Sequence, residues 1–307
     1  MSSLTKVMCS PHIHSGKSTA GIMGDVLIAL LPATVAGVVI FGWRALLVIA
    51  VCVLASVAFE ALFNLIIKKE QTVGDLSAAV TGLLLALNLP ADIPVWQCVV
   101  GSLFAVVLVK CLFGGIGQNL VNPAITARVF MLVAFGSMAV PSFPADAVAS
   151  ATPLAAEKMP SLLTLFLGNH GGAIGETCAA ALLLGGIYLL VRRVITWHVP
   201  AVFIGTVFVF SFLMEGFNAA DALAMILSGG VFLGAIFMAT DYTTSPSTPW
   251  GKVLFGLGCG LFTCLIRYFG SYPEGVSFAI LFMNILNPYI SGWTRRKVFT
   301  AGGHDEE

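Results

Sequence analysis

The stretch "SAAVTGLLLALNLP", residues 77–90, is an apolar run that stops at an asparagine and a proline. It is shorter than the roughly 20 residues with which a helix crosses the hydrocarbon core of a bilayer. A second interrupted run, "LAMILSGGVFLGAIFMATD", covers residues 223–241. Each run leads through "PVW" or "TPW" to another apolar helix and then to an Asn-Pro pair, at Asn122-Pro123 or Asn287-Pro288. This shared order predicts two related halves, with chance similarity between apolar helices as the alternative.

The whole chain has the composition of a membrane protein. Its 307 residues are 58% hydrophobic and 10% charged, with a mean hydropathy of +0.97, whereas soluble domains carry roughly 25% charged residues. We predict an all-α, polytopic membrane protein with about ten transmembrane helices. Five helices per half would make the two repeats inverted, a recurring plan of membrane transport proteins. The predicted spans lie at about 21–41, 45–66, 76–90, 94–113, 124–140, 173–191, 196–214, 219–240, 251–269 and 275–293.

The basic residues orient these spans. With the N-terminus inside, ten basic residues fall in cytoplasmic connections and only Arg44 and Lys158 in outer ones, as the positive-inside rule requires. Both termini are therefore expected in the cytoplasm. The predicted divisions are an N-terminal arm (1–20), a first five-helix repeat (21–140), an extracytoplasmic loop (141–172), a second repeat (173–293) and a cytoplasmic tail (294–307). The balance of 15 basic and 15 acidic residues gives no sign of a nucleic-acid partner.

The cysteines and histidines predict no metal site. The seven cysteines form no C-x-x-C pair and six lie in apolar runs, so we interpret them as small apolar fillers. His12 and His14 are close together but lack further ligands. No secretory signal is visible, because the first residues are polar throughout.

The segment "FGGIGQNLVNPAITARVF", residues 113–130, is the sharpest candidate site. Its glycines permit close approach of the backbone. Asn119 and Asn122 are three residues apart, so they would share a helical face and present donors and acceptors to a planar polar ring. The alternative is a helix-breaking turn whose asparagines satisfy the backbone.

Acidic residues within or beside the apolar blocks form a second group of candidates. A carboxylate at a helix centre costs roughly 2.5–3.5 kcal/mol, so it usually pairs or lines a polar path. Arg128 and Arg267 are candidate partners. Placement at the membrane interface is the alternative for Asp25, Glu176 and Asp241, which lie near predicted helix ends. The acids concerned are Asp25, Glu60, Glu176 and Asp241.

Four motifs in this order carry a resemblance: "SPHIHSGKST", "GGIGQNLVNPA", "DAVASATPL" and "FMATDYTTSPSTPWG". They resemble the RnfD subunit of the Rnf electron-transport complex and the related NqrB subunit of the sodium-pumping NADH:quinone reductase, over roughly residues 10–295. The length favours the Rnf subunit.

The resemblance implies two flavins. In that family FMN is joined by a phosphoester to the threonine of the motif Asp-x-x-Ser/Thr-Gly/Ser-Ala-Thr, which here gives Asp146 and Thr152. Ala149 departs from the motif, because the family usually has Ser or Thr at this position. A separate flavin transferase is implied, acting outside the cytoplasmic membrane. The second, non-covalent flavin (riboflavin or FMN) is associated in the family with positions that match Asn119 and Asn122.

The implied function is that of a flavin-carrying subunit of an ion-motive ferredoxin:NAD⁺ oxidoreductase in the bacterial cytoplasmic membrane, with the Thr152 loop on the outer side. The implied partners are the flavoprotein RnfG, the membrane proteins RnfA and RnfE, and the peripheral proteins RnfB and RnfC. The protein would hold and tune its cofactors without an acid–base or nucleophilic site of its own. Two alternatives remain from the residues alone, an inverted-repeat solute transporter or channel without a cofactor, and a cofactor-free membrane scaffold.

Overall fold

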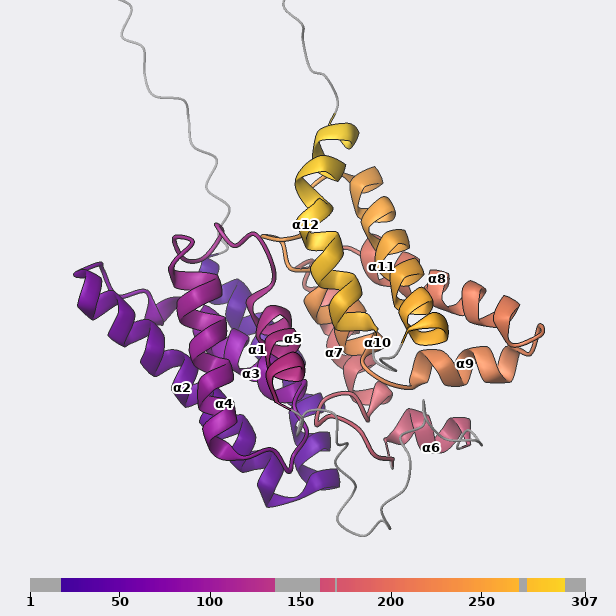
Figure 1. Cartoon of the computed structure of the whole chain (residues 1–307), viewed down its shortest axis with the longest axis horizontal. Coiled ribbons are helices and arrows are strands. Elements are labelled where there is room, and N and C mark those ends of the chain that lie inside the picture. The colour runs from indigo at the N-terminus through magenta and orange to yellow at the C-terminus, as the bar shows by residue number, and fades with distance from the viewer. Residues whose placement is uncertain (1–17, 136–160, 169, 271–274, 296–307) are drawn as a thin grey trace, which may run out of the picture.

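The computed structural model describes residues 18–135, 161–168, 170–270 and 275–295. The elements in these ranges are helices (Figure 1). In chain order they are α1 (Thr19–Phe41), α2 (Trp43–Ile67), η1 (Val73–Asp75), α3 (Ser77–Leu87), α4 (Val95–Leu103), η2 (Phe104–Cys111), α5 (Pro123–Ala134), α6 (Leu162–Leu167), α7 (Ala179–Val191), α8 (His198–Met214), α9 (Ala219–Leu227), α10 (Val231–Leu233), η4 (Gly234–Met238), α11 (Pro249–Phe269) and α12 (Val276–Thr294).

Four of these helices are long and apolar enough to cross a membrane, namely α1, α2, α11 and α12. A fifth span is formed if α9 and the segment Val231–Met238 are counted together, although they are bent by 66° at the break between them. Each of the ten predicted blocks contains an apolar helix or one of these bent pieces. The prediction of a polytopic, all-helical membrane protein is therefore confirmed, and the number of ten spans stays a prediction.

The block predicted as a helix over 173–191 is wrong at its start, because α7 begins only at Ala179. The preceding segment pairs with the broken end of α3 instead: the Ile174 N–H donates to the Leu89 carbonyl at 3.1 Å, and the Gly175 N–H donates to the Leu87 carbonyl at 2.8 Å. These bonds satisfy carbonyl groups that the break would otherwise leave without partners in an apolar interior. The short helix α6, inside the predicted outer loop 141–172, was not predicted.

The same helix pairings occur in the two halves of the chain. In the first half α2 packs against α3 and α4, and in the second α8 packs against α9 and α11. Glycines allow these close approaches, as small residues do between membrane helices. A Cβ atom at Gly82 of α3 would lie 2.7 Å from the Cys52 carbonyl oxygen of α2, and one at Gly260 of α11 would lie 2.6 Å from Cβ of Thr206 in α8.

The two halves meet where α1 packs against α7 and α5 packs against α12. Figure 1 shows the indigo-to-magenta helices of the first half beside the orange-to-yellow helices of the second. The α1–α7 contact depends on Gly185, where a Cβ atom would come within 2.0 Å of the Ala29 carbonyl oxygen. The contact between the halves is thus close backbone packing, which leaves no room for a methyl group at this point.

Gly185→Ala tests that contact. Replacing a mid-helix glycine by alanine otherwise stabilises a helix by roughly 0.5–1 kcal/mol, but here overpacking is expected to destabilise by about 1–3 kcal/mol. Gly205→Ala is the matched control, because Gly205 is also helical and its Cβ would meet nothing within 4 Å. Thermal unfolding of the purified protein in detergent should show a lower midpoint for Gly185→Ala and an equal or higher one for Gly205→Ala. Equal midpoints for the two variants would contradict the packing described.

Candidate functional site

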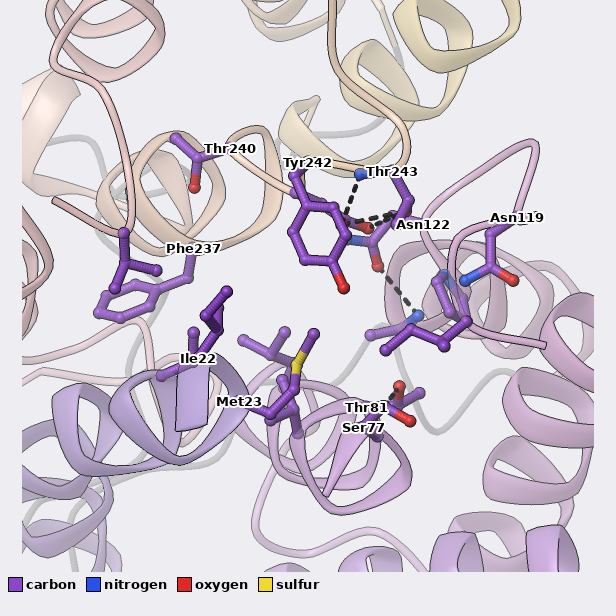
Figure 2. A pocket seen from close by; sticks show the side chains of 18 of the residues that line it. Ile22, Met23, Ser77, Thr81, Asn119, Asn122, Phe237, Thr240, Tyr242 and Thr243 are labelled. Carbon is purple, nitrogen blue, oxygen red and sulfur yellow. Dashed lines mark hydrogen bonds between the residues drawn. The ribbon is translucent and has the colours of Figure 1, made fainter. Parts of the chain in front are cut away.

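A cavity of about 100 Å³ lies where the two halves meet. Its walls come from α1, α3, the end of η2, the loop before α5, the end of α7 and the segment after η4. Figure 2 shows side chains from these elements converging on it. Residues from both halves are therefore needed to complete the cavity.

The cavity is apolar over most of its wall and polar at one side. Ile22 and Met23 of α1 and Phe237 of η4 contribute apolar surface. In Figure 2 the ring of Tyr242 lies across the cavity from Met23 and Thr81. Apolar walls with a few directed polar groups are typical of sites for small organic ligands and cofactors. Tyr242 was not predicted as a site residue, because a tyrosine in a turn has no distinctive sequence pattern.

The loop before α5 places the two predicted asparagines. The backbone of this loop has φ angles of 118°, 103° and 89° at Gly114, Gly115 and Gly117. Residues other than glycine rarely adopt such angles. The prediction that Asn119 and Asn122 share a helical face is wrong, because Asn119 lies in this non-helical loop and Asn122 is the N-cap of α5. Both nevertheless line the cavity.

Asn122 has a structural role. Its Oδ1 accepts hydrogen bonds from the backbone N–H groups of Ala124 at 3.1 Å and Ile125 at 3.3 Å, and its Nδ2 donates to the Met238 carbonyl at 3.3 Å. The first two bonds cap α5, and the third joins the loop of the first half to η4 of the second. With its amide oriented to satisfy both ends, Asn284 of α12 accepts from the Asn122 N–H.

The side chain of Asn119 differs from that of Asn122 in its hydrogen bonding. Its Oδ1 is buried and has no hydrogen-bond partner within the part of the chain that the structure describes. A buried amide oxygen without a partner costs free energy, so a ligand that donates a hydrogen bond here would relieve that cost. The two asparagines are therefore not equivalent, although their sequence motif gives no reason to separate them.

Asp241 lies at the edge of the same cavity. Its carboxylate accepts from the N–H and the hydroxyl of Thr243, at 3.1 and 3.0 Å, and from the hydroxyl of Thr244 at 3.4 Å. These bonds fold the chain back on itself directly after η4, in the manner of an Asx turn. Its carboxylate thus shapes the turn that carries Tyr242.

A buried ion pair between Lys110 and Glu60 lies beside the cavity. Lys110 Nζ is 2.8 Å from Glu60 Oε1, and the two side chains are each only 2% exposed. Lys110 also donates to the Ser77 hydroxyl, and Thr72 donates to Glu60 Oε1 at 2.9 Å. Lys110 was not predicted as a site residue. The signal for it is a single basic residue inside an apolar run, which requires an acid nearby in space.

A second buried ion pair joins Arg128 of α5 to Glu176, which precedes α7, with Nη1 and Oε1 2.7 Å apart. Arg128 also donates to the Asn88 side chain at the broken end of α3. The prediction that Arg128 is an acid's partner is confirmed. Arg267 donates to the carbonyl groups of Met225 and Ser228, at 2.7 and 3.0 Å.

Asp25 of α1 pairs with Arg192 at the end of α7, at 3.1 Å, and accepts a hydrogen bond from Tyr188 at 3.0 Å. The three predicted polar-path acids are therefore in different surroundings: Asp241 lines the cavity, whereas Asp25 and Glu176 are held in ion pairs between the halves. Thr152, with its neighbours Asp146 and Ala149, lies outside the described residues.

The Arg128–Glu176 pair gives a test of these buried charges. Arg128→Met leaves Glu176 buried without its partner and should destabilise the protein by about 3–5 kcal/mol. Adding Glu176→Gln should recover most of that loss, because no buried charge then remains. Arg44→Met is the control, since Arg44 and Asp92 form an exposed pair whose loss should cost below about 1 kcal/mol. Unfolding in detergent measures the stability of the three variants. A double variant as unstable as Arg128→Met would show that Arg128 and Glu176 do not form this ion pair.

Comparison with known proteins places the chain. Residues 6–300 match the model of the NQR2, RnfD, RnfE family. The chain is 47% identical to the D subunit of the Na(+)-translocating ferredoxin:NAD(+) oxidoreductase complex of Acetobacterium woodii, over 95% of this chain and 94% of the relative. It is 38% identical to the D subunit of the proton-translocating ferredoxin:NAD(+) oxidoreductase complex of Clostridium ljungdahlii, with 94% of each chain covered. The chain therefore belongs to the NQR2, RnfD, RnfE family.

Proposed function

We propose that this protein is the flavin-carrying membrane subunit of an Rnf-type complex, which couples electron transfer from ferredoxin to NAD⁺ to ion translocation. The observation that carries the proposal is the similarity over almost the whole chain to relatives named as the D subunits of such complexes. Its partners are then the other proteins of that complex, namely the flavoprotein RnfG, the membrane proteins RnfA and RnfE, and the peripheral proteins RnfB and RnfC.

The proposed membrane arrangement is ten spans in two inverted five-helix repeats. The repeated pairing of α2 with α3 and α4, and of α8 with α9 and α11, supports two copies of one unit. The distribution of basic residues supports cytoplasmic termini and an outer Thr152 loop in the bacterial cytoplasmic membrane. In this orientation the cavity, at the start of α1, is near the cytoplasmic side.

FMN is proposed to be attached through a phosphoester to Thr152 by a flavin transferase. The support is the motif that ends at Thr152 and its position between two hydrophobic blocks, on the outer side by the charge distribution. A flavin can exchange electrons singly or in pairs with neighbouring carriers. The contribution of the chain is to present one hydroxyl for attachment and to hold the cofactor at the membrane surface.

A second, non-covalent flavin is proposed to occupy the cavity between the halves. Several features fit a flat heteroaromatic ring: apolar walls from Ile22, Met23 and Phe237, the ring of Tyr242, and the amide of Asn119, whose oxygen has no partner in the described part of the chain. Figure 2 shows the nitrogen of this amide on the cavity side. With the amide turned over, Asn119 would accept a hydrogen bond from the ring, while Asn122 fixes the loop that carries Asn119. The cofactor is riboflavin or FMN.

The ion path is proposed to use acids at the contact between the halves. Asp241 lines the cavity, and Asp25 and Glu176 are paired to arginines beside α7. Acidic side chains that pair with basic ones inside membrane segments often mark ion pathways.

Intact-mass measurement on the purified protein tests the covalent flavin. The native chain should carry the added mass of a phosphoester-linked FMN, and Thr152→Ala should lose it. Ser150→Ala is the matched control, because it removes a neighbouring hydroxyl and should keep the added mass. An unmodified native chain, or a Thr152→Ala chain that keeps the modification, would show that Thr152 is not the attachment site.

Asn119→Leu tests the second flavin. It should lower the flavin released on denaturation by at least about tenfold, since it removes a buried hydrogen bond and adds a bulky group at the cavity, with little change in unfolding. Asn122→Leu should instead destabilise the protein by about 1 kcal/mol or more through loss of the α5 cap. Gln118→Leu, in the same loop, is the control. Released flavin unchanged in Asn119→Leu would remove this assignment.

A further inference from the structure

Lys110 is the cationic side chain among the described residues that line the cavity. It is 1% exposed and lies at the end of η2, a π-helical segment. Such segments are rare and are found frequently at functional sites. The acid at the same cavity, Asp241, is engaged by Thr243 and Thr244 of its own turn, whereas the ammonium of Lys110 is paired with Glu60.

The surroundings of Lys110 fix its position. Its Nζ donates to Glu60 Oε1 at 2.8 Å and to the Ser77 hydroxyl. Glu60 is itself held by Thr72, which accepts a hydrogen bond from Asn64 at 3.0 Å. An ammonium has three N–H donors, so one of the three has no partner within the described ranges.

The ion pair is oriented toward the cavity. Lys110 lines the cavity, whereas Glu60 lies behind it in α2 and is not a lining residue. The ammonium of Lys110 donates to the hydroxyl of Ser77, which also lines the cavity, so the positive member of the pair is the one next to the cavity. A buried ion pair is weak support for stability, because burial removes both charges from water, and well-packed apolar residues often serve as well. The presence of a buried lysine at this position is therefore better explained by binding of a ligand than by stability of the fold.

We propose that Lys110 is a positioning residue for the ligand of this cavity, donating its third N–H to a carbonyl oxygen of a planar, electron-accepting heteroaromatic ring. The inference rests on the proposed non-covalent flavin, and it adds a residue that the sequence motifs do not contain. Lys110 and Asn119 would bind different polar atoms of the ring, one as a donor and the other as an acceptor. The ammonium also favours the ring when it carries more negative charge, which raises its reduction potential.

The experiment uses the full-length chain with Thr152→Ala, so that covalent flavin does not contribute, stripped of bound flavin and titrated with riboflavin. Glu60→Gln alone would leave the Lys110 ammonium buried without its acid, so the reference is the parent chain, in which Lys110 and Glu60 are paired. The double variant Glu60→Gln/Lys110→Met buries no unpaired charge but lacks the ammonium. It should bind about ten- to a hundredfold more weakly, the effect of losing one hydrogen bond to a charged group. Lys252→Met, which removes a lysine outside the cavity, should bind as the parent does.

A second readout separates positioning from folding. The riboflavin that remains bound to the double variant should have a lower reduction midpoint potential than in the parent, which loss of structure alone would not produce. Equal affinity and equal potential in the double variant and the parent would overturn the role of Lys110 and leave the flavin site standing. Absence of riboflavin binding by the parent would instead overturn the flavin site itself.

If the double variant does not fold, the parent still tests the inference. Riboflavin analogues with sulfur in place of one ring carbonyl oxygen accept hydrogen bonds poorly. The analogues have sulfur at position 2 or at position 4 of the ring. The analogue whose sulfur replaces the oxygen that Lys110 binds should bind at least about tenfold more weakly than riboflavin. Equal affinity for all three compounds would contradict a charged hydrogen bond to either carbonyl.

Discussion

The structure depends on one constraint: backbone groups freed by a broken helix in an apolar interior must find partners within the protein. At the break between α9 and α10 the partner is Arg267 of the same half, whereas at two other ends the partners come from the other half of the chain. The end of α3 is paired by Ile174 and Gly175, and the end of η4 accepts a hydrogen bond from Asn122. Because the ends of α3 and η4 are completed by the opposite half, the two halves are joined where these elements stop, and the cavity forms at that junction.

Buried charged side chains also find their partners within the protein. The side chains of Lys110, Glu60 and Glu176 are each about 2% exposed, and each is in an ion pair. The pairs link α2 to η2 and α5 to the segment before α7, so they also fix how the broken elements meet. A pair that lies beside a cavity can act on a ligand as well, and Lys110 is in that position.

The sequence predicted the helices well, because long apolar blocks bounded by Gly, Pro and Asn leave few alternatives. It failed at 173–178, where the chain forms a turn instead of a helix. This turn pairs with Leu87 and Leu89, a tertiary contact that the local sequence does not indicate. For the site, the loop around Asn119 and Asn122 was found, but their spacing alone could not separate a helix cap from a free amide. Lys110 and Tyr242 were missed, because only the assembled halves place them at the cavity.

The planar redox cofactor proposed at the junction of the two halves can be looked for directly. The most direct measurement is a cryo-electron microscopy map of the intact native complex, at a resolution that shows side chains. The account predicts flat density between Met23 and Tyr242, in contact with the amide of Asn119. A map with ordered side chains around this cavity and only lipid or water inside it would contradict the proposal.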